Sequence, residues 1–274
     1  MSDAPATLEG WFVSHDRWTI DWRRWRAVPK AQREAAVKEL TSALHVIATT
    51  GVGRGDSAVY GVLGQKGDLC FLHFRDSLGA LKEAEFAVRN LAIADYLLPA
   101  GAYLSVIEVG LYEATAMAQR KLAERGLTTA APEWDAAFAA EMATQTSRLE
   151  TRLRPVIPSS AWLCFYPMNK RRGEQDNWYA LDAEARRTLM RGHGKVGHRY
   201  HGQVTQIIGG SIALDDWEWG VSLFADDPVI FKKLVTEMRY DPASSRYAEF
   251  GPFVIGRRLL IADLQGYFAG SLPA

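Results

Sequence analysis

A histidine with small neighbours is the residue of this sequence that most suggests a bound ligand. The pattern predicts a helix from Asp182, an N-cap aspartate, and the apolar stripe of this helix reaches His193. Glycines stand at positions 192, 194 and 197, although each costs about 1 kcal/mol of helix propensity relative to alanine. An imidazole beside a cleared surface suits axial ligation of a haem iron, because the flat macrocycle must approach the backbone. The alternative is a core histidine near a fraying helix end.

A tyrosine and a basic run follow each other where an apolar strand ends. Tyr166 precedes Pro167, which cannot donate to a sheet ladder, so we expect the strand to end there and the tyrosine to lie at the sheet margin. Lys170, Arg171 and Arg172 come next. A phenol near an oxidising iron can lose an electron and a proton, and these basic side chains could hold carboxylates. The alternative is a strand-end tyrosine beside a solvated basic loop.

A glutamine is predicted among apolar side chains on the next strand. Gln206 shares one face with Val204 and Ile208 by the two-residue period of a strand. Burying an amide without a partner would cost about 1 to 3 kcal/mol, so Gln206 either bonds within the sheet or faces a ligand. Further candidates for anion contacts, each of which could equally be a surface residue, are Arg152, Arg239 and Ser244.

The composition of the chain argues against several classes of function. Lysine plus arginine, 32 residues, equals aspartate plus glutamate, 32 residues, so no global field attracts nucleic acid or an anionic membrane. Cys70 and Cys164 lie in apolar runs without other ligands at the spacing of a metal motif, which favours a reducing compartment. No signal peptide, bilayer-length apolar stretch, phosphate loop or nucleophile elbow is visible. We therefore expect a soluble cytoplasmic protein.

The apolar patterns predict the same order of elements twice. The first half is predicted to contain a strand at 10–13, a helix at 30–49, a hairpin of strands at 58–63 and 69–74, a helix from Ser77 that Pro99 and Gly101 stop, and a strand at 103–109. The second half is predicted to contain a strand at 161–166, a helix at 182–200, a hairpin at 203–224, a helix at 228–239 and a strand at 250–255.

Each half therefore has the order βαββαβ, which defines an α+β fold of two ferredoxin-like units. Such a unit exposes one sheet face, so the two units are expected to pack sheet against sheet. The predicted domains are an amino-terminal half at 1–113, a helical connector at 114–158 that Pro132 divides, and a carboxy-terminal half at 159–274. The candidate site lies in the carboxy-terminal half.

From about Ala161 to Gly256 the chain resembles the chlorite dismutase-like superfamily, and within it the coproheme decarboxylases. The resemblance is carried by ordered motifs: Tyr166-Pro167-Met168-Asn169-Lys170-Arg171-Arg172, Asn177-Trp178-Tyr179, Leu189-Met190-Arg191-Gly192-His193-Gly194, Val204-Thr205-Gln206-Ile207-Ile208, Asp215-Asp216-Trp217-Glu218-Trp219-Gly220-Val221, Phe224-Ala225-Asp226-Asp227-Pro228, Glu237-Met238-Arg239-Tyr240 and Ser245-Arg246-Tyr247-Ala248-Glu249-Phe250-Gly251-Pro252-Phe253.

The resemblance implies a role for each candidate residue. His193 is the axial ligand of the iron of coproheme, Tyr166 forms a radical, and Lys170 helps to position the reactive propionate. Gln206 is the distal residue above the iron, where chlorite-splitting relatives have an arginine. The positions that match contacts to propionates are Arg152, Arg239 and Ser244.

The implied reaction uses hydrogen peroxide to convert two propionates of coproheme to vinyl groups, which gives haem b. Coproheme is then both the substrate and the redox centre, and relatives assemble as homopentamers. Two features bear on the type of pocket. Gly209 stands where a threonine is more usual, and no histidine lies between Leu149 and Tyr166, which favours a glutamine-type distal pocket.

Three other functions remain open at this stage. A chlorite dismutase or haem peroxidase would keep His193 but would not depend on Tyr166. A non-catalytic haem-binding or carrier protein would use only the pocket. A cofactor-free α+β module, such as a small monooxygenase, would bind no iron porphyrin.

Overall fold

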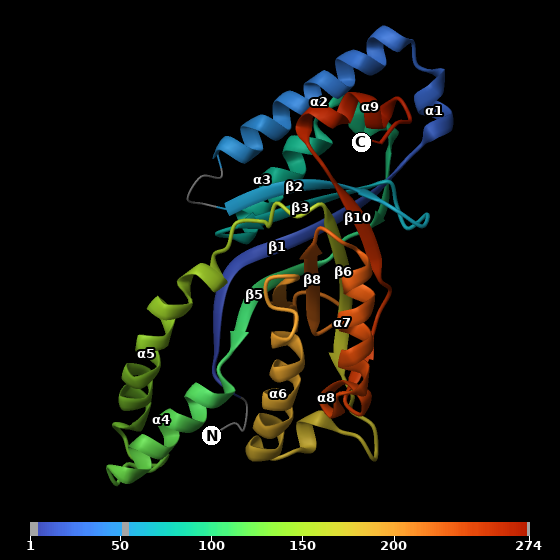
Figure 1. The fold of residues 1–274 in the computed structure, drawn as a ribbon. Helices are drawn as coiled ribbons and strands as arrows, with labels where there is room; N and C mark the ends of the chain where they lie inside the picture. The colour runs from blue at the N-terminus through green and yellow to red at the C-terminus, as the bar shows by residue number, and fades with distance from the viewer. Residues whose placement is uncertain (1–4, 51–54, 273–274) are drawn as a thin grey trace.

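The structure is a computed structural model that describes residues 5–50 and 55–272, without the side chains of 49, 50 and 144–147. Both halves contain four principal strands and two principal helices in the predicted order (Figure 1). The first half comprises β1 (Thr7–Ile20), α1 (Trp22–Ala27), α2 (Lys30–Thr50), β2 (Gly55–Val62), β3 (Leu69–Arg75), α3 (Leu78–Arg89), a 3-10 helix (Ala92–Tyr96), β4 (Leu97–Gly101) and β5 (Leu104–Gly110).

The connector and the second half follow the same plan. Their elements are α4 (Tyr112–Glu124), α5 (Trp134–Leu153), β6 (Trp162–Lys170), a 3-10 helix (Trp178–Ala180), α6 (Ala183–His198), β7 (Thr205–Gly210), β8 (Trp219–Ala225), α7 (Val229–Tyr240), α8 (Pro242–Ser245), β9 (Ala248–Phe250), β10 (Val254–Leu259), a 3-10 helix (Ile261–Asp263) and α9 (Leu264–Phe268). The α+β fold class and the helical connector broken at Pro132 are confirmed.

The two halves join edge to edge and not only face to face. The strands follow the order β10-β2-β3-β1-β5-β7-β8-β6, and β6 also pairs with β10, so the sheet closes into a barrel. Two seams join the halves, β5 with β7 and β10 with β2. Closure removes the unpaired edges that each half would otherwise present. The division at residues 113 and 158 stays a prediction.

Four apolar clusters lie in the described part of the molecule. One lies inside the barrel and draws on both halves, with Phe74 and Tyr60 of the first half and Phe165 and Phe224 of the second. A second lies between the sheet of the first half and helices α2 and α9. The third lies between the sheet of the second half and helices α6 and α7, and the fourth packs α4 against α5. The outer face of the second sheet, beneath α6 and α7, positions the candidate site.

Several predicted boundaries were wrong for identifiable physical reasons. β1 extends well beyond 10–13, because its polar residues Ser14, His15 and Asp16 are buried and continue the strand. α3 ends at Arg89 and not near Pro99, since a 3-10 helix and β4 intervene. The last strand, predicted at 250–255, is divided into β9 and β10.

β6 continues through Pro167, so the prediction that Tyr166 lies at a sheet margin was wrong. The carbonyl of Pro167 accepts a hydrogen bond from Gly251 N at 2.8 Å, on the side where β9 and β10 are interrupted. In a strand the N–H and C=O of one residue point to the same side. The N–H that Pro167 lacks would therefore point toward the gap between β9 and β10. The proline therefore leaves the pairing with β8 intact.

Gly209, which departs from the usual threonine, lies at the seam of β5 and β7. A Cβ atom at this position would approach Ser105 Cβ to 2.8 Å. The glycine is therefore explained by the close approach of the two halves. Among the described residues, the structure contains no helix whose length and hydropathy would allow it to cross a membrane.

The seam gives a prediction on stability. Gly209→Ala is expected to lower the free energy of unfolding by about 1 to 3 kcal/mol, because the added methyl group overpacks the contact with Ser105. Urea denaturation measures this change. The control is Gly79→Ala in α3, where the nearest atom to a new Cβ, Ser77 Oγ, is 3.9 Å away, so stability should be equal or higher. Equal stability of Gly209→Ala and the parent would contradict a tight seam.

Candidate functional site

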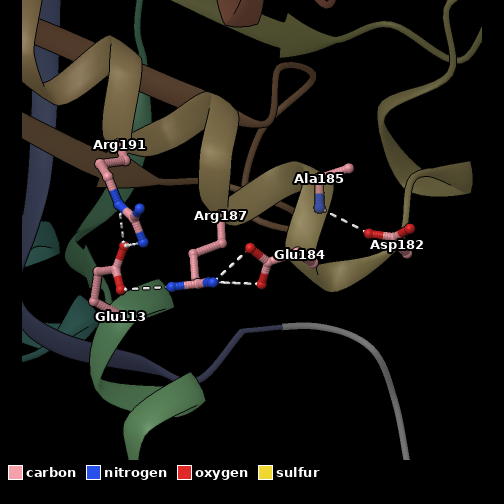
Figure 2. A network of polar contacts seen from close by, with 6 residues as sticks. All are labelled: Glu113, Asp182, Glu184, Ala185, Arg187 and Arg191. Atoms are coloured by element: carbon pink, nitrogen blue, oxygen red, sulfur yellow. Dashed lines mark hydrogen bonds and ion pairs between the residues drawn. The ribbon is translucent and has the colours of Figure 1, made fainter.

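The helix that carries His193 is fixed at its start by side chains. The carboxylate of Asp182 accepts from Ala185 N at 2.7 Å, which confirms the predicted N-cap. Glu113, at the start of α4, accepts from Arg187 at 3.0 Å and from Arg191 Nε at 2.8 Å, and Figure 2 shows this link from the connector to α6. These arginines lower the pKa of Glu113 through hydrogen bonds. The connector therefore holds the histidine helix from one side.

A buried aspartate holds the imidazole of His193 from the other side. His193 Nδ1 lies 2.8 Å from Asp241 Oδ2, and the Asp241 side chain is 4% exposed whereas that of His193 is 27% exposed. A carboxylate can only accept, so Nδ1 carries the hydrogen of this bond. This arrangement is the one that orients metal-binding histidines. Nε2 is therefore the ring nitrogen of His193 that lies outside this hydrogen bond.

The space next to His193 is open on one side only. A Cβ at Gly194 would meet no atom within 4 Å, whereas one at Gly192 would lie 3.8 Å from Asp241 Oδ1. A Cβ at Gly197 would approach the terminal methyl of Met238 to 3.2 Å, so this glycine serves the packing of α6 on α7. Gly194 therefore borders open space, Gly192 is at ordinary contact distance from Asp241, and Gly197 fits closely against Met238. The clearing for a flat ligand stays a prediction.

Lys170 and His193 both contact the segment at residues 241–243. Its Nζ donates to the carbonyl of Ala243 at 3.0 Å and lies 4.1 Å from the ring centre of Trp178. Burial lowers the pKa of Lys170 to about 8, although the carboxylates of Asp241 and Glu218 act in the opposite direction. The amine is therefore held beside the buried Asp241 and not in the solvated loop of the alternative interpretation.

Tyr166 is 7% exposed and packs against two phenylalanines. Its ring centre lies 4.5 Å from that of Phe253 and 5.8 Å from that of Phe250. Burial raises the pKa of Tyr166 well above its usual value, so the phenol keeps its hydrogen at physiological pH. A protonated phenol in an apolar setting can give up an electron and a proton together, as radical formation requires.

Arg239 and Ser244 lie together at a cleft beside these phenylalanines. The cleft has a volume of about 570 Å³, and both residues line it. The guanidinium of Arg239 lies 4.8 Å from the ring centre of Phe250, and Ser244 is buried. The two predicted anion contacts therefore line the same cleft. Phe250 and Phe253, which pack against Tyr166, line it too.

Gln206 lies elsewhere on the same sheet face. Its side chain is exposed, as is that of Ile208, so the prediction of an amide buried among apolar groups was wrong. Ile208 pairs with Val221, which pairs with Tyr166, so Ile208 and Tyr166 lie two strand spacings apart, about 10 Å. Within the described chain, Gln206 has no hydrogen bond that would occupy its amide. It is free to face a ligand between α6 and β7.

Arg152 is not brought to this group of residues. It is exposed near the end of α5, a helix that packs on α4, β1 and β5 and lies across α6 from α7 and α8 (Figure 1). Burial lowers the pKa of His15 and of His73 to about 3, and His198 and His201 are exposed.

Sequence reasoning missed Asp241, whose carboxylate orients His193. The dipeptide Asp241-Pro242 is a typical helix start, and this signal predicts an N-cap, not a partner for a histidine 48 residues away. Trp178, which lies under the amine of Lys170, was quoted as part of a motif without a role.

The residues around His193 fit an iron porphyrin, which would need one protein ligand. No three histidine, cysteine, aspartate or glutamate side chains converge as a metal site in residues 5–50 and 55–272. A porphyrin iron needs only one protein ligand, and His193 supplies one with a partnered Nδ1 and an open Nε2.

The comparisons with known proteins agree with this geometry. A family model for chlorite dismutase matches residues 33–259, and the chain belongs to this family. It is 41% identical, over its whole length, to a Halobacterium salinarum protein whose name proposes that it binds haem. The chain spans 53% of that relative, about half its length.

Solved structures give the same picture. A Thermus thermophilus protein described as a novel haem-binding protein is 40% identical with a TM-score of 0.83, and the match covers 98% of this chain and 99% of that one. A mutant chlorite dismutase of Candidatus Nitrospira defluvii has a TM-score of 0.69 over 96% of this chain and 97% of that one. It is 18% identical, so the similarity shows the fold alone.

The setting of Lys170 predicts a pH dependence. Its pKa is about 8 in the folded state and about 10.5 when unperturbed, so between these values the unfolded chain binds more protons. The contribution of Lys170 to stability therefore rises with pH in this window, and below pH 8 the burial of the charged amine is at its most unfavourable.

Lys170→Met should remove this contribution. The difference in unfolding free energy between parent and variant, measured by urea denaturation from pH 7 to 10.5, is expected to grow in favour of the parent as pH rises. Lys82→Met, at an exposed lysine paired with Glu85, should give a flat difference. A flat difference for Lys170→Met would show that the amine is not buried.

Proposed function

We propose that this protein is a hydrogen peroxide-dependent coproheme decarboxylase that converts two propionates to vinyl groups and yields haem b. The observation that carries the proposal is that several predicted site residues contact the turn from α7 to α8 or line the cleft beside it. Asp241 of this turn binds His193, Ala243 binds Lys170, and Ser244 lines the cleft with Arg239. The names of two relatives of about 40% identity, one a putative haem-binding protein and one described as haem-binding, support a porphyrin as the ligand.

Coproheme, as substrate, supplies an iron that peroxide oxidises. His193 would hold this iron through Nε2, with Asp241 fixing the ring. Gln206 would face the opposite side of the porphyrin from β7, because its amide is exposed on the sheet face that α6 partly covers. The glutamine supplies no positive charge there, whereas chlorite-splitting relatives have an arginine.

Tyr166 would be oxidised first and would then oxidise the propionate. Its phenol loses an electron and a proton, and the tyrosyl oxygen then takes a hydrogen atom from the β-carbon of the propionate. The carboxylate leaves as carbon dioxide, and the remaining electron returns to the oxidised substrate centre. For each propionate, one hydrogen peroxide and one proton are consumed, and one vinyl group, one carbon dioxide and two waters form.

Lys170 would hold the reactive carboxylate before it leaves. Its lowered pKa of about 8 still leaves the amine mainly protonated at neutral pH, so it can donate a charge-assisted hydrogen bond. Arg239, Ser244 and Arg152 are proposed to bind propionates. The proposal includes a homopentamer, as the family resemblance implies, and a cytoplasmic location, which the two cysteines in apolar runs favour.

A second candidate is a haem-binding protein without decarboxylase activity. The names of the two relatives of about 40% identity mention haem binding and no reaction. Such a protein would use His193 and Asp241 and would need no function for Tyr166.

Tyr166→Phe tests the choice between these functions. The variant should bind coproheme as the parent does, while haem b formation after peroxide addition falls by at least about 100-fold, a loss typical of removing a group that handles a proton in the transition state. Mass spectrometry of the porphyrin measures the loss of each carbon dioxide. Tyr240→Phe, at an 84% exposed tyrosine, is the matched control and should retain activity.

Two outcomes would contradict the proposal. Parental rates in Tyr166→Phe would remove the tyrosyl step. Recovery of coproheme with four intact propionates from the parent protein would favour the haem-binding protein.

A further inference from the structure

Two adjoining clefts lie at the end of β6, and one arginine lines both. The larger, of about 570 Å³, includes Arg171, Arg239 and Ser244, with Phe250 and Phe253 as its apolar residues. The smaller, of about 480 Å³, includes Lys170, Arg171 and Arg172. Arg171 therefore lies between the lysine and the two predicted anion contacts.

The larger cleft shares residues with the surroundings of Tyr166. Phe250 and Phe253 line this cleft and also contact the ring of Tyr166, with ring centres 5.8 and 4.5 Å apart. A carboxylate held in the cleft therefore lies next to the aromatic residues that contact the phenol. A group bound here is near the residue proposed to form the radical.

Arg171 differs from the neighbouring arginines in its partners. Arg172 forms an ion pair with Glu218 at 3.2 Å, and Arg246 forms one with Asp176 at 2.8 Å. In the part of the chain that the structure describes, the guanidinium of Arg171 forms no ion pair. Glu249 lines both clefts and is the one acidic residue in either, so positive charge prevails in both.

The backbone of Arg171 is held on both sides. Its N–H donates to the carbonyl of Tyr247 at 2.9 Å, and its carbonyl accepts from Trp178 N at 2.9 Å. A guanidinium on a fixed backbone loses less freedom when it binds a carboxylate, and its planar fork suits bidentate binding. The position of Arg171 is therefore set before any ligand arrives.

We propose that Arg171 is a specificity-determining residue that binds the carboxylate of a reacting propionate, the one nearest Tyr166. This inference rests on the proposed function and deepens it. The bound group is present in coproheme and absent from haem b, because the reaction converts it to a vinyl group. Arg171 therefore favours the substrate over the product.

Titrations without peroxide test this inference by binding alone. Ferric coproheme and ferric haem b are each added to the parent protein and to Arg171→Gln, and the Soret shift gives the two dissociation constants. Arg171→Gln should weaken coproheme binding about tenfold, equivalent to about 1.4 kcal/mol, and leave haem b binding unchanged. Arg171→Lys should retain part of the affinity, since it keeps the charge and loses the fork.

Arg246→Gln is the matched control, because it removes an arginine that is already paired with Asp176 and lines neither cleft. It should leave both dissociation constants unchanged. Equal weakening of coproheme and haem b binding in Arg171→Gln would overturn the inference, since it would mean that a retained propionate is bound. No change for either porphyrin would also overturn it.

The failures of the two proposals are distinguishable. If the parent protein binds coproheme and converts it to haem b, while Arg171→Gln has parental dissociation constants, only the role of Arg171 is wrong. If the parent shows no saturable Soret shift with coproheme, the proposed function is wrong and the role of Arg171 falls with it.

Discussion

The hydrogen bond between His193 and Asp241 is the interaction on which the site depends. A buried carboxylate without a partner is strongly unfavourable, so the imidazole and the carboxylate fix each other's positions. Asp241 also belongs to the backbone turn that begins α8, where its carbonyl accepts from Ser244 and Ser245. The bond thus ties the histidine helix α6 to the segment that holds Lys170 and lines the cleft.

The closed barrel explains why one half carries the site and the other does not. Both halves present an outer sheet face to a pair of helices, and in the first half this face is filled with apolar side chains, including Leu40 and Leu44 of α2. In the second half, α6 carries His193 flanked by glycines in the corresponding helix. Gln206 and Ile208 of β7 remain exposed beside it. The same topology therefore carries different side chains on the two outer sheet faces.

The features that could be predicted from the sequence are those that depend on residues close together in the chain. The N-cap at Asp182 and the break at Pro132 follow from side-chain and backbone chemistry within a few residues, and both were predicted. The buried polar residues of β1 and the passage of β6 through Pro167 depend on neighbouring strands, which a single segment does not reveal. Asp241 was missed for the same reason, since its role depends on a histidine in another helix. Closure of the barrel also depends on pairing between distant edges, β2 with β10 and β5 with β7.

A family resemblance implied that His193, Lys170, Arg239 and Ser244 belong to one site. In the structure the first two contact the turn from α7 to α8, and the other two line the cleft beside it. Arg152 does not join them, and Gln206 faces outward where burial was expected. The unexpected exposure of Gln206 has a physical meaning, since a polar amide on an open sheet face can contact a ligand without the cost of burial.

The central claim is that His193 holds an iron porphyrin through Nε2. It is tested most directly by titrating the parent protein and His193→Ala with ferric coproheme and recording the Soret band together with the electron paramagnetic resonance of the iron. The account predicts saturable binding with a histidine-ligated iron signal in the parent, and the loss of that signal in His193→Ala. The same iron signal in both proteins, or no saturable binding by the parent, would contradict it.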